Sequence, residues 1–303
     1  RSARPDICMN HRTINRTVGN FVPDRLSQAM SVRGLSATEL AARIGVTNTT
    51  ISRWRNRNQV PSPAMLEAMA SELRVAPEWL TRPMRSATSK PNYRGSIAQL
   101  KQERGLLGGR MEWLEEVSAQ LEEFVDYPLV NLPELGLKRV AEISDSVIED
   151  AADACRKLWN LGDGPVGDTL LLLENAGVVV ALEETGIACI EGLSSWSMSG
   201  RPLVLLCADK GNAFRSRFDA AHELGHLVLH RNIAAPADSA THKLMEQQAH
   251  RFAGAFLLPA RGFVAEVSTP VSLHALVFLK QRWGVSVAAM IMRLRALGVV
   301  SED

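Results

Sequence analysis

Residues 21–83 alternate short apolar stretches with polar turns, as in a bundle of short amphipathic helices. Ser36 opens the stretch S-A-T-E, in which Ser36 and Glu39 have the spacing of a helix capping box. The helix that follows carries small alanines on one face and stops at Gly45, which favours a left-handed C-cap. Thr47 is expected to cap the next helix. The pattern predicts an all-α domain of five helices over residues 21–83.

Residues 84–136 are predicted to hold a linker and connecting helices. The part from 84 to 96 is polar and contains Ser, Pro and Gly, which is typical of a linker. Residues 97–126 have a helical pattern that three glycines are expected to interrupt: Gly105, Gly108 and Gly109. Beyond them apolar residues recur at spacings of 3, 4 and 3, at Leu114, Val117, Leu121 and Phe124. This spacing fits either the short coiled-coil seam of a homodimer or a helix docked on its own domain, and two heptads are too few to decide.

Residues 137–303 combine helical periodicity with two short β-prone runs, at Val178–Ala181 and Leu203–Cys207. Helices are predicted at Ile148–Leu158, Val166–Asn175, Arg215–His230 and Lys243–Leu258, and within Val271–Leu297. Such a mixture predicts an α+β domain. The whole chain is therefore expected to be mainly α with a small β component.

Composition sets bounds on this picture. The chain has 303 residues, of which 46% are hydrophobic and 22% charged, and this suits a globular protein long enough for two cores. The formal net charge is only +1, so any nucleic-acid surface has to be local. The four cysteines are scattered along the chain, at Cys8, Cys155, Cys189 and Cys207. Their spacing fits neither a disulfide framework nor a cysteine metal site, and it suits a reducing compartment.

The sequence shows no clear signal for secretion or for insertion into a membrane. No apolar run approaches the roughly 20 residues that a membrane helix needs. The first residues, RSARPDIC, lack the apolar core of a signal peptide. We therefore expect a cytoplasmic protein without membrane contact. Residues 1–20 are expected to be disordered or, for the eight residues before Met9, to derive from cloning.

The predicted helix after Gly45 has a buried side and an exposed side. Ile51 and Trp54 lie almost one turn apart and are expected to hold the helix in the core. Polar side chains are left on the exposed N-terminal side: Asn48, Thr49, Ser52 and Arg53. A local basic cluster is formed by Arg33, Arg43, Arg53, Arg55 and Arg57. Such a helix can meet base edges in the major groove while arginines contact phosphates.

Residues 22–82 resemble the Xre, or lambda-repressor-like, family of helix-turn-helix DNA-binding domains, through the run L-S-A-T-E-L-A-A-R-I-G-V-T-N-T-T-I-S-R-W-R. The resemblance implies a double-stranded DNA operator as the partner. The residues expected to contact DNA are Asn48, Thr49, Ser52 and Arg53 at the bases and Thr38 and Arg57 at backbone phosphates. The alternative is a helical module that has lost DNA binding and whose arginines only solvate the surface.

The stretch His222-Glu223-Leu224-Gly225-His226 is the strongest chemical signal in the chain. Its two histidines are one helical turn apart, so both imidazoles face the same way, as a zinc site requires. Glu223 lies beside them and could act as the general base on a water molecule. The pattern indicates a zinc metallopeptidase.

A catalytic zinc site needs a third protein ligand. A metzincin would have Gly at position 229 and His at position 232, where this chain has Leu229 and Asn232, so that class is excluded. Glu246 lies 20 residues past the second histidine on another predicted helix, which is the thermolysin-like arrangement. The rival ligands are His230, His242 and His250. We expect His230 and His250 to support a ligand rather than to bind the metal.

The run R-x-R-F-x-x-A-H-E-L-G-H-L-x-x-H, followed by M-E-Q-Q-A-H-R-F-A-G-A-F-L-L-P, resembles the ImmA/IrrE family of metallopeptidases. The likeness spans roughly residues 145–265 and implies a zincin-like α+β domain with one Zn²⁺ per chain. The implied zinc ligands are His222, His226 and Glu246, with Glu223 as the general base. Members are cytosolic, commonly sit beside or are fused to Xre-type repressors, and are thought to cleave repressors in mobile-element induction or stress responses.

This chain departs from the family pattern at two positions. The family often has an acidic residue before the alanine of its second helix and an asparagine after it, where this chain has Gln248 and His250. The departure leaves the ligand at Glu246 in place. It bears on how the ligands are oriented, and therefore on activity.

Two functions remain open at this point. In the first, the chain is a DNA-binding regulator whose zinc-dependent endopeptidase domain cleaves a specific protein, such as a repressor. In the second, the zinc domain is a sensor or docking module, and the chain is a repressor or an antitoxin that binds a toxin. An intact Glu223 favours the enzyme, because a structural zinc site does not need it, and the fused DNA reader favours regulation in both cases. The ligand types favour zinc without excluding other divalent ions.

Overall fold

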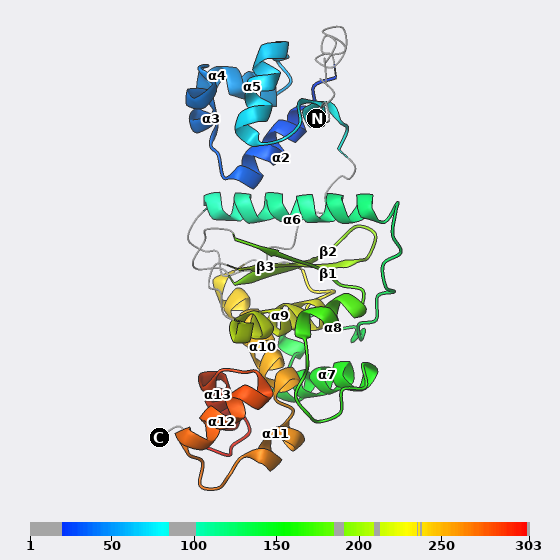
Figure 1. The fold of residues 1–303 in the computed structure, drawn as a ribbon, viewed down its shortest axis with the longest axis vertical. Coiled ribbons are helices and arrows are strands. Elements are labelled where there is room, and N and C mark those ends of the chain that lie inside the picture. Colours follow the sequence, from blue (N-terminus) through cyan, green and yellow to red (C-terminus); the bar gives the residue numbers. More distant parts are fainter. Residues whose placement is uncertain are drawn as a thin grey trace, which may run out of the picture. The chain divides into compact units, whose positions relative to one another are not determined.

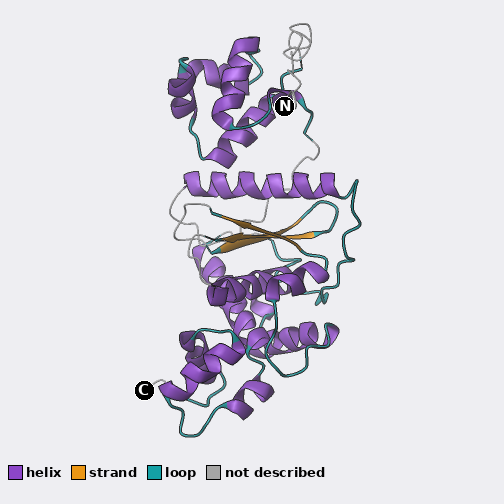
Figure 2. Ribbon diagram, in the orientation of Figure 1, coloured by secondary structure: helices purple, strands orange, loops and turns teal. Residues whose placement is uncertain are grey.

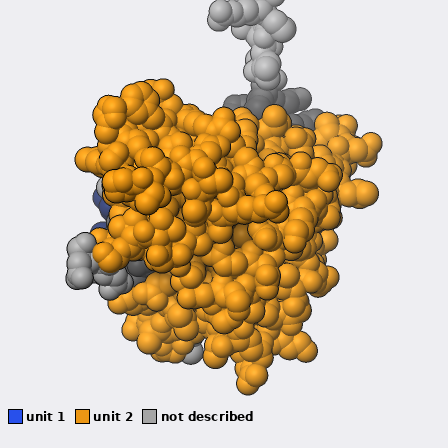
Figure 3. Space-filling model, turned by 90° about the horizontal axis from the view of Figure 1, so that it is seen from below, with its two compact units in different colours: residues 1–87, 100–113 blue, residues 88–99, 114–303 orange. Residues whose placement is uncertain are grey.

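The computed structural model describes residues 20–84, 101–184, 191–208, 213–234, 236 and 238–301. The chain divides into two compact units, one of residues 1–87 and 100–113 and one of residues 88–99 and 114–303 (Figure 3). The boundary between the units falls inside helix α6 (Lys101–Leu121). Residues 1–19, and 85–96 of the predicted linker, lie outside the described residues.

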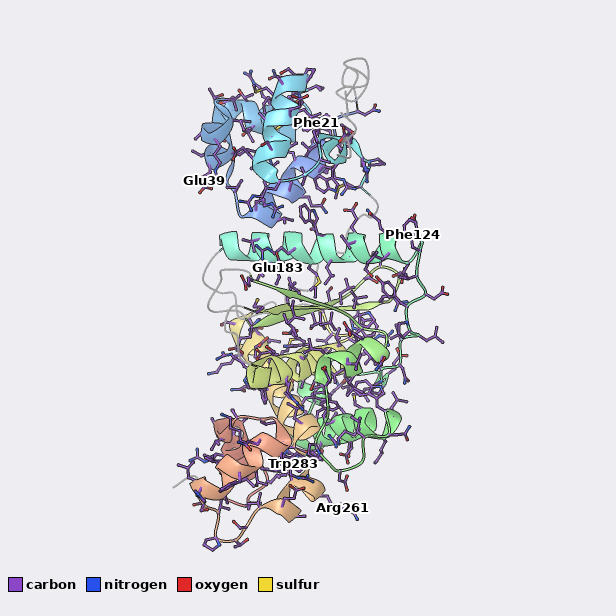
Figure 4. All side chains as sticks on the ribbon, viewed as in Figure 1. Phe21, Glu39, Phe124, Glu183, Arg261 and Trp283 are labelled. Atoms are coloured by element: carbon purple, nitrogen blue, oxygen red, sulfur yellow. The ribbon has the colours of Figure 1, made fainter. Side chains whose placement is uncertain are left out.

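The first unit is built from short helices with well-defined ends (Figure 1). They are α2 (Pro23–Arg33), α3 (Ala37–Ile44), α4 (Asn48–Arg55), α5 (Pro63–Leu73) and the 3₁₀ helix η1 (Pro77–Thr81). The predicted capping box is present, because the backbone N–H of Ser36 donates to Glu39 (2.8 Å; Glu39 is labelled in Figure 4) and the backbone N–H of Glu39 donates to Ser36 (3.2 Å). Gly45 has a φ of 72° and ends α3 as predicted. The expected five-helix domain is confirmed.

Helix α6 runs without a break through Gly105, Gly108 and Gly109, so the predicted interruption is wrong. The reason is visible at Gly109, where a Cβ atom would lie only 2.8 Å from the backbone nitrogen of Val32 at the end of α2. The glycine therefore serves a close helix–helix approach rather than a break. In the same part of α6, Leu107 and Met111 are buried.

The end of α6 also differs from the prediction. The helix stops at Leu121, and Phe124 lies in the turn that follows, 82% exposed (Figure 4). A coiled-coil seam that includes Phe124 is therefore wrong, because the residue is not on the helix. Val117 and Leu121 remain as exposed apolar residues of α6.

The second unit contains a three-stranded sheet of β1 (Val179–Glu183), β2 (Gly192–Trp196) and β3 (Pro202–Cys207), in the order β1-β3-β2 (Figure 2). β1 and β3 are parallel, with Val180 opposite Val204, and β2 is antiparallel to β3, with Ser194 opposite Val204. The predicted runs correspond to β1 and β3. β2 was not predicted, because its sequence G-L-S-S-W has no sustained apolar run.

The other helices of the second unit lie on one side of this sheet (Figure 1). They are η2 (Val140–Glu142), α7 (Asp145–Leu158), α8 (Thr169–Asn175), α9 (Ala213–Leu229), α10 (Ser239–Leu257), α11 (Ala260–Glu266), α12 (Leu273–Trp283) and α13 (Val287–Ala296). α9 packs against β2 and β3 on one side and against α10 on the other (Figure 1). The expected class, mainly α with a small β component, is confirmed.

The C-terminal stretch is helical, as predicted, and forms two helices, because Gly284 ends α12 in a left-handed conformation (φ 63°). α12 and α13 are bent by 104° relative to each other. Trp283, labelled in Figure 4, is completely buried at this bend. Among the described helices none is by itself long and apolar enough to cross a membrane, and α12 and α13 meet that criterion only as a bent pair.

Candidate metal centre and nucleic-acid interface

The close packing of α9 and α10 determines where the candidate ligands lie. Gly225 of α9 faces Ala249 of α10, and a Cβ atom on Gly225 would meet the Cα atom of Ala249 at 3.2 Å. α10 begins at Ser239 rather than at Lys243 as predicted, because Asp238 caps it by accepting a hydrogen bond from a backbone N–H of its first turn. Glu246 of α10 lies next to His222 and His226 of α9.

Two imidazoles and one carboxylate converge at this crossing. The Nε2 atoms of His222 and His226 are 3.1 Å apart. Oε2 of Glu246 lies 3.2 Å from Nε2 of His222, and Oε1 lies 3.4 Å from Nε2 of His226. Zinc bonds of about 2.0–2.1 Å place the ligands of a tetrahedral ion about 3.3 Å apart. Two nitrogens and one carboxylate with these separations could hold a metal ion.

The electrostatics of the cluster suit a cation. Burial by itself raises the pKa of Glu246, but its contacts with His222 and His226 outweigh burial and hold that pKa well below its usual range. Burial lowers the pKa of His222, yet the hydrogen bond to Glu246 and the nearby charges of Glu223 and Asp219 raise it overall. Oε1 of Glu246 is buried without a well-directed hydrogen bond. A buried carboxylate oxygen without a well-directed donor fits a metal ligand.

Glu223 lies beside the three candidate ligands and is not one of them. It is 5% exposed and follows His222 on α9. Gly192, the first residue of β2, lies against it, and a Cβ atom there would be 2.9 Å from Oε1 of Glu223. Sequence reasoning missed Gly192, because the glycine stands in no recognisable motif and β2 itself was not predicted.

The other histidines of the region surround the candidate ligands. His230 is completely buried, and its Nδ1 lies 3.0 Å from Nδ1 of His226. The ring of His250 lies edge-on to the ring of His222, with centroids 4.8 Å apart, and burial and the charge of His222 lower the pKa of His250. Nε2 of His242 is 3.8 Å from Oε1 of Glu246. Each of the three is therefore a neighbour of a candidate ligand.

Most of the nucleic-acid candidates on α3 and α4 are exposed. Ile51 and Trp54 bury one side of α4. The exposed residues are Asn48, Thr49 and Arg53 of α4 and Thr38 of α3, while Ser52 is half-buried. This matches the division into buried and exposed sides that the sequence predicts.

Four arginines of the predicted basic cluster contact other residues of the protein. Arg43 pairs with Glu72 at 3.7 Å, and Arg55 donates a hydrogen bond of 3.1 Å to Oγ of Ser27. Arg33 donates a hydrogen bond of 2.8 Å to the carbonyl of Leu73, so it is tied to the domain rather than displayed on its surface. Arg57 lies beyond the end of α4, has a φ of 61°, and forms an ion pair of 2.8 Å with Asp24. Both partners of that pair are well exposed, so Arg57 is available to a phosphate that competes with Asp24.

Comparison with known protein families agrees with both parts of this description. Residues 33–80 match the model of a helix-turn-helix family, and residues 173–295 match the model of the IrrE N-terminal-like domain. No protein with a curated description matches the chain. The first match covers α3, α4 and α5, and the second covers the sheet and the crossing of α9 and α10. The chain therefore carries a helix-turn-helix domain followed by a peptidase-family domain of the IrrE/ImmA type.

Proposed function

We propose that this chain is a DNA-binding transcriptional regulator whose second domain is a zinc-dependent endopeptidase. The observation that carries the proposal is the convergence of two imidazole nitrogens and one carboxylate at 3.1–3.4 Å from one another, with Glu223 buried beside them. A purely structural zinc site has no use for that fourth residue. The match to the IrrE N-terminal-like domain supports the same assignment.

His222, His226 and Glu246 are the proposed ligands of one Zn²⁺ per chain. Two histidines and a glutamate form the ligand set of thermolysin-like catalytic sites, which leave a fourth position for water or substrate. The bound ion would supply a Lewis acid that polarises a peptide carbonyl and acidifies water. His230 contacts the proposed ligand His226, and His250 contacts the proposed ligand His222; both would help to hold these ligands in position without binding the metal.

Glu223 is the proposed general base. Its carboxylate takes a proton from the attacking water and then delivers it to the amide nitrogen of the leaving peptide. The burial of Glu223 between α9 and the start of β2 supports this role, because a base has to be held in position next to the reacting atoms.

The first domain is proposed to read a double-stranded operator in the major groove. Asn48, Thr49, Ser52 and Arg53 are the proposed base-reading residues, and Thr38 and Arg57 the proposed phosphate contacts. We further propose that the regulator acts in the cytoplasm as a homodimer on a palindromic site, which the exposed Val117 and Leu121 support. Its substrate would be a specific protein such as a repressor or a toxin.

The proposal is tested with the full chain and with Glu223→Gln, both loaded with zinc. Each is incubated with the purified repressors and toxins encoded beside it, and fragments are identified by mass spectrometry. We expect the wild-type chain to cleave one of them at a defined bond and Glu223→Gln to bind the same amount of zinc without cleaving. Equal zinc content with no cleavage by the wild-type chain would favour a sensor or docking module instead.

A further inference from the structure

Next to the proposed metal ligands, a chain of buried hydrogen bonds leads from His226 of α9 through His230 to Gln248 of α10. Nδ1 of His226 lies 3.0 Å from Nδ1 of His230, and Nε2 of His230 lies 3.1 Å from Oε1 of Gln248. The exposed fractions of these three residues are 1%, 0% and 4%. We propose that Gln248, acting through His230, sets the tautomer and orientation of His226 so that Nε2 of His226 carries no proton and can bind the metal. This inference rests on the proposed metal site.

The orientation of the Gln248 amide follows from its surroundings. Its Nε2 donates to the backbone carbonyls of Val140 (3.1 Å) and Ile143 (3.0 Å). Carbonyl oxygens only accept hydrogen bonds, so the amide nitrogen has to face them. The reversed amide would place its oxygen against two other oxygens. Oε1 of Gln248 therefore faces His230.

The position of each proton follows from that orientation. Because an amide oxygen can only accept, Nε2 of His230 has to donate to it. In the proposed arrangement His230 is neutral, so its one N–H lies on Nε2 and its Nδ1 accepts from Nδ1 of His226. His226 then carries its proton on Nδ1, and its Nε2 keeps the lone pair that a metal requires.

If donors and acceptors in these hydrogen bonds were reversed, Nε2 of His226 would be protonated and could not bind a metal. If Nδ1 of His230 donated to His226, the proton of His226 would have to sit on Nε2, where it faces Glu246 and His222. That proton would have to move before a metal could bind. Gln248 prevents this arrangement, and it does so at a position where the ImmA/IrrE resemblance leads us to expect an acidic residue.

Two substitutions separate this role from simple packing. Gln248→Glu has nearly the same shape and keeps an oxygen that can accept from His230. Its second oxygen faces the carbonyls of Val140 and Ile143, so it has to carry a proton, which it can donate to only one of them. Gln248→Met has similar size and loses both kinds of hydrogen bond. A purely structural role predicts similar losses in both variants, whereas the proposed role predicts a loss only in the second.

The measurement is the zinc affinity of the full chain, determined by competition with a chelator. We expect Gln248→Met to bind zinc about 10–100-fold more weakly than the wild-type chain, as is usual when a partner of a metal-ligating histidine is lost, and Gln248→Glu to stay within a few-fold. Unchanged affinity in Gln248→Met, or equal losses in both variants, would overturn the proposal. If the wild-type chain itself binds no zinc, the proposed function fails rather than this inference alone.

A second measurement needs no variant and covers the case in which Gln248→Met does not fold. Nitrogen-15 spectra of the histidine side chains in the metal-free wild-type chain report which ring nitrogen carries the proton. We expect the proton on Nδ1 of His226 and on Nε2 of His230. A proton on Nε2 of His226 would overturn the inference even if zinc binds.

Discussion

Gly192 and Glu223 are in contact across the gap between β2 and α9, and a Cβ atom on Gly192 would lie 2.9 Å from Oε1 and 3.1 Å from Cγ of Glu223. Real Cβ atoms do not approach a neighbour this closely unless the neighbour moves. The absence of a side chain at Gly192 therefore allows Glu223 to occupy its position next to the proposed ligands.

Gly192→Ala is expected to displace the Glu223 carboxylate without touching the ligands. Zinc content should stay at the wild-type level, while peptide cleavage should fall on the order of 100-fold, because a displacement of about 1 Å can cost a catalytic group that much. Metal analysis and cleavage rates measured on the same preparations check this. Gly167→Ala is the matched control, since a Cβ atom at Gly167 would meet nothing within 4 Å. A cleavage rate of Gly192→Ala equal to that of the wild-type chain would show that the contact between Gly192 and Glu223 is not needed for catalysis.

Removal of the metal is expected to destabilise the wild-type chain. A ligand that binds only the folded state adds about 2.7 kcal/mol when its free concentration is 100 times its dissociation constant. Thermal unfolding with excess zinc and then with a chelator should therefore show a clear loss of stability. Glu246→Gln, which keeps the shape of a proposed ligand, should show little difference between the two conditions. Glu174→Ala, which removes an exposed carboxylate of α8, should respond as the wild-type chain does. Equal responses of Glu246→Gln and the wild-type chain would exclude Glu246 as a ligand.

Arg53 and Arg57 are expected to contribute to DNA binding in different ways. Arg53 is exposed on α4, and Arg53→Ala should cost about 1–3 kcal/mol at the preferred operator and relax base preference there, if the side chain reads guanine. Arg57→Ala should weaken binding to all DNA sequences alike. It should also reduce the slope of the logarithm of the binding constant against the logarithm of the salt concentration by about one unit. Titration of specific and random duplexes at several salt concentrations separates the two effects. The same loss of specificity in both variants would contradict the assignment of Arg53 to a base and of Arg57 to a phosphate.

Local features of the chain were largely predictable from sequence. The capping box at Ser36 and Glu39, the left-handed Gly45 and the HExxH helix all depend on residues a few positions apart. Such short-range patterns are read directly from spacing. The position of Glu246 beside His222 and His226 was also predictable, because its distance along the chain matches a known ligand arrangement.

Features that depend on distant parts of the chain were not predictable. β2 is short and polar, and it is a strand because it pairs with β3. Gly109 was read as a break, although it is a point of contact with α2, and nothing in the sequence near Gly109 indicates its neighbour. The hydrogen bonds through His230 and Gln248 depend on how α10 is rotated against α9, which the spacing of residues does not specify.

The central claim, that hydrolysis controls regulation, is tested most directly in cells with the Glu223→Gln chain. A reporter is placed under the promoter that the wild-type chain represses, and its expression is measured before and after the signal that relieves repression. We predict that Glu223→Gln represses normally, because metal and DNA binding persist, but does not release the reporter after the signal. Release equal to that of the wild-type chain, with zinc and DNA binding intact, would contradict the account and leave the second domain as a sensor or docking module.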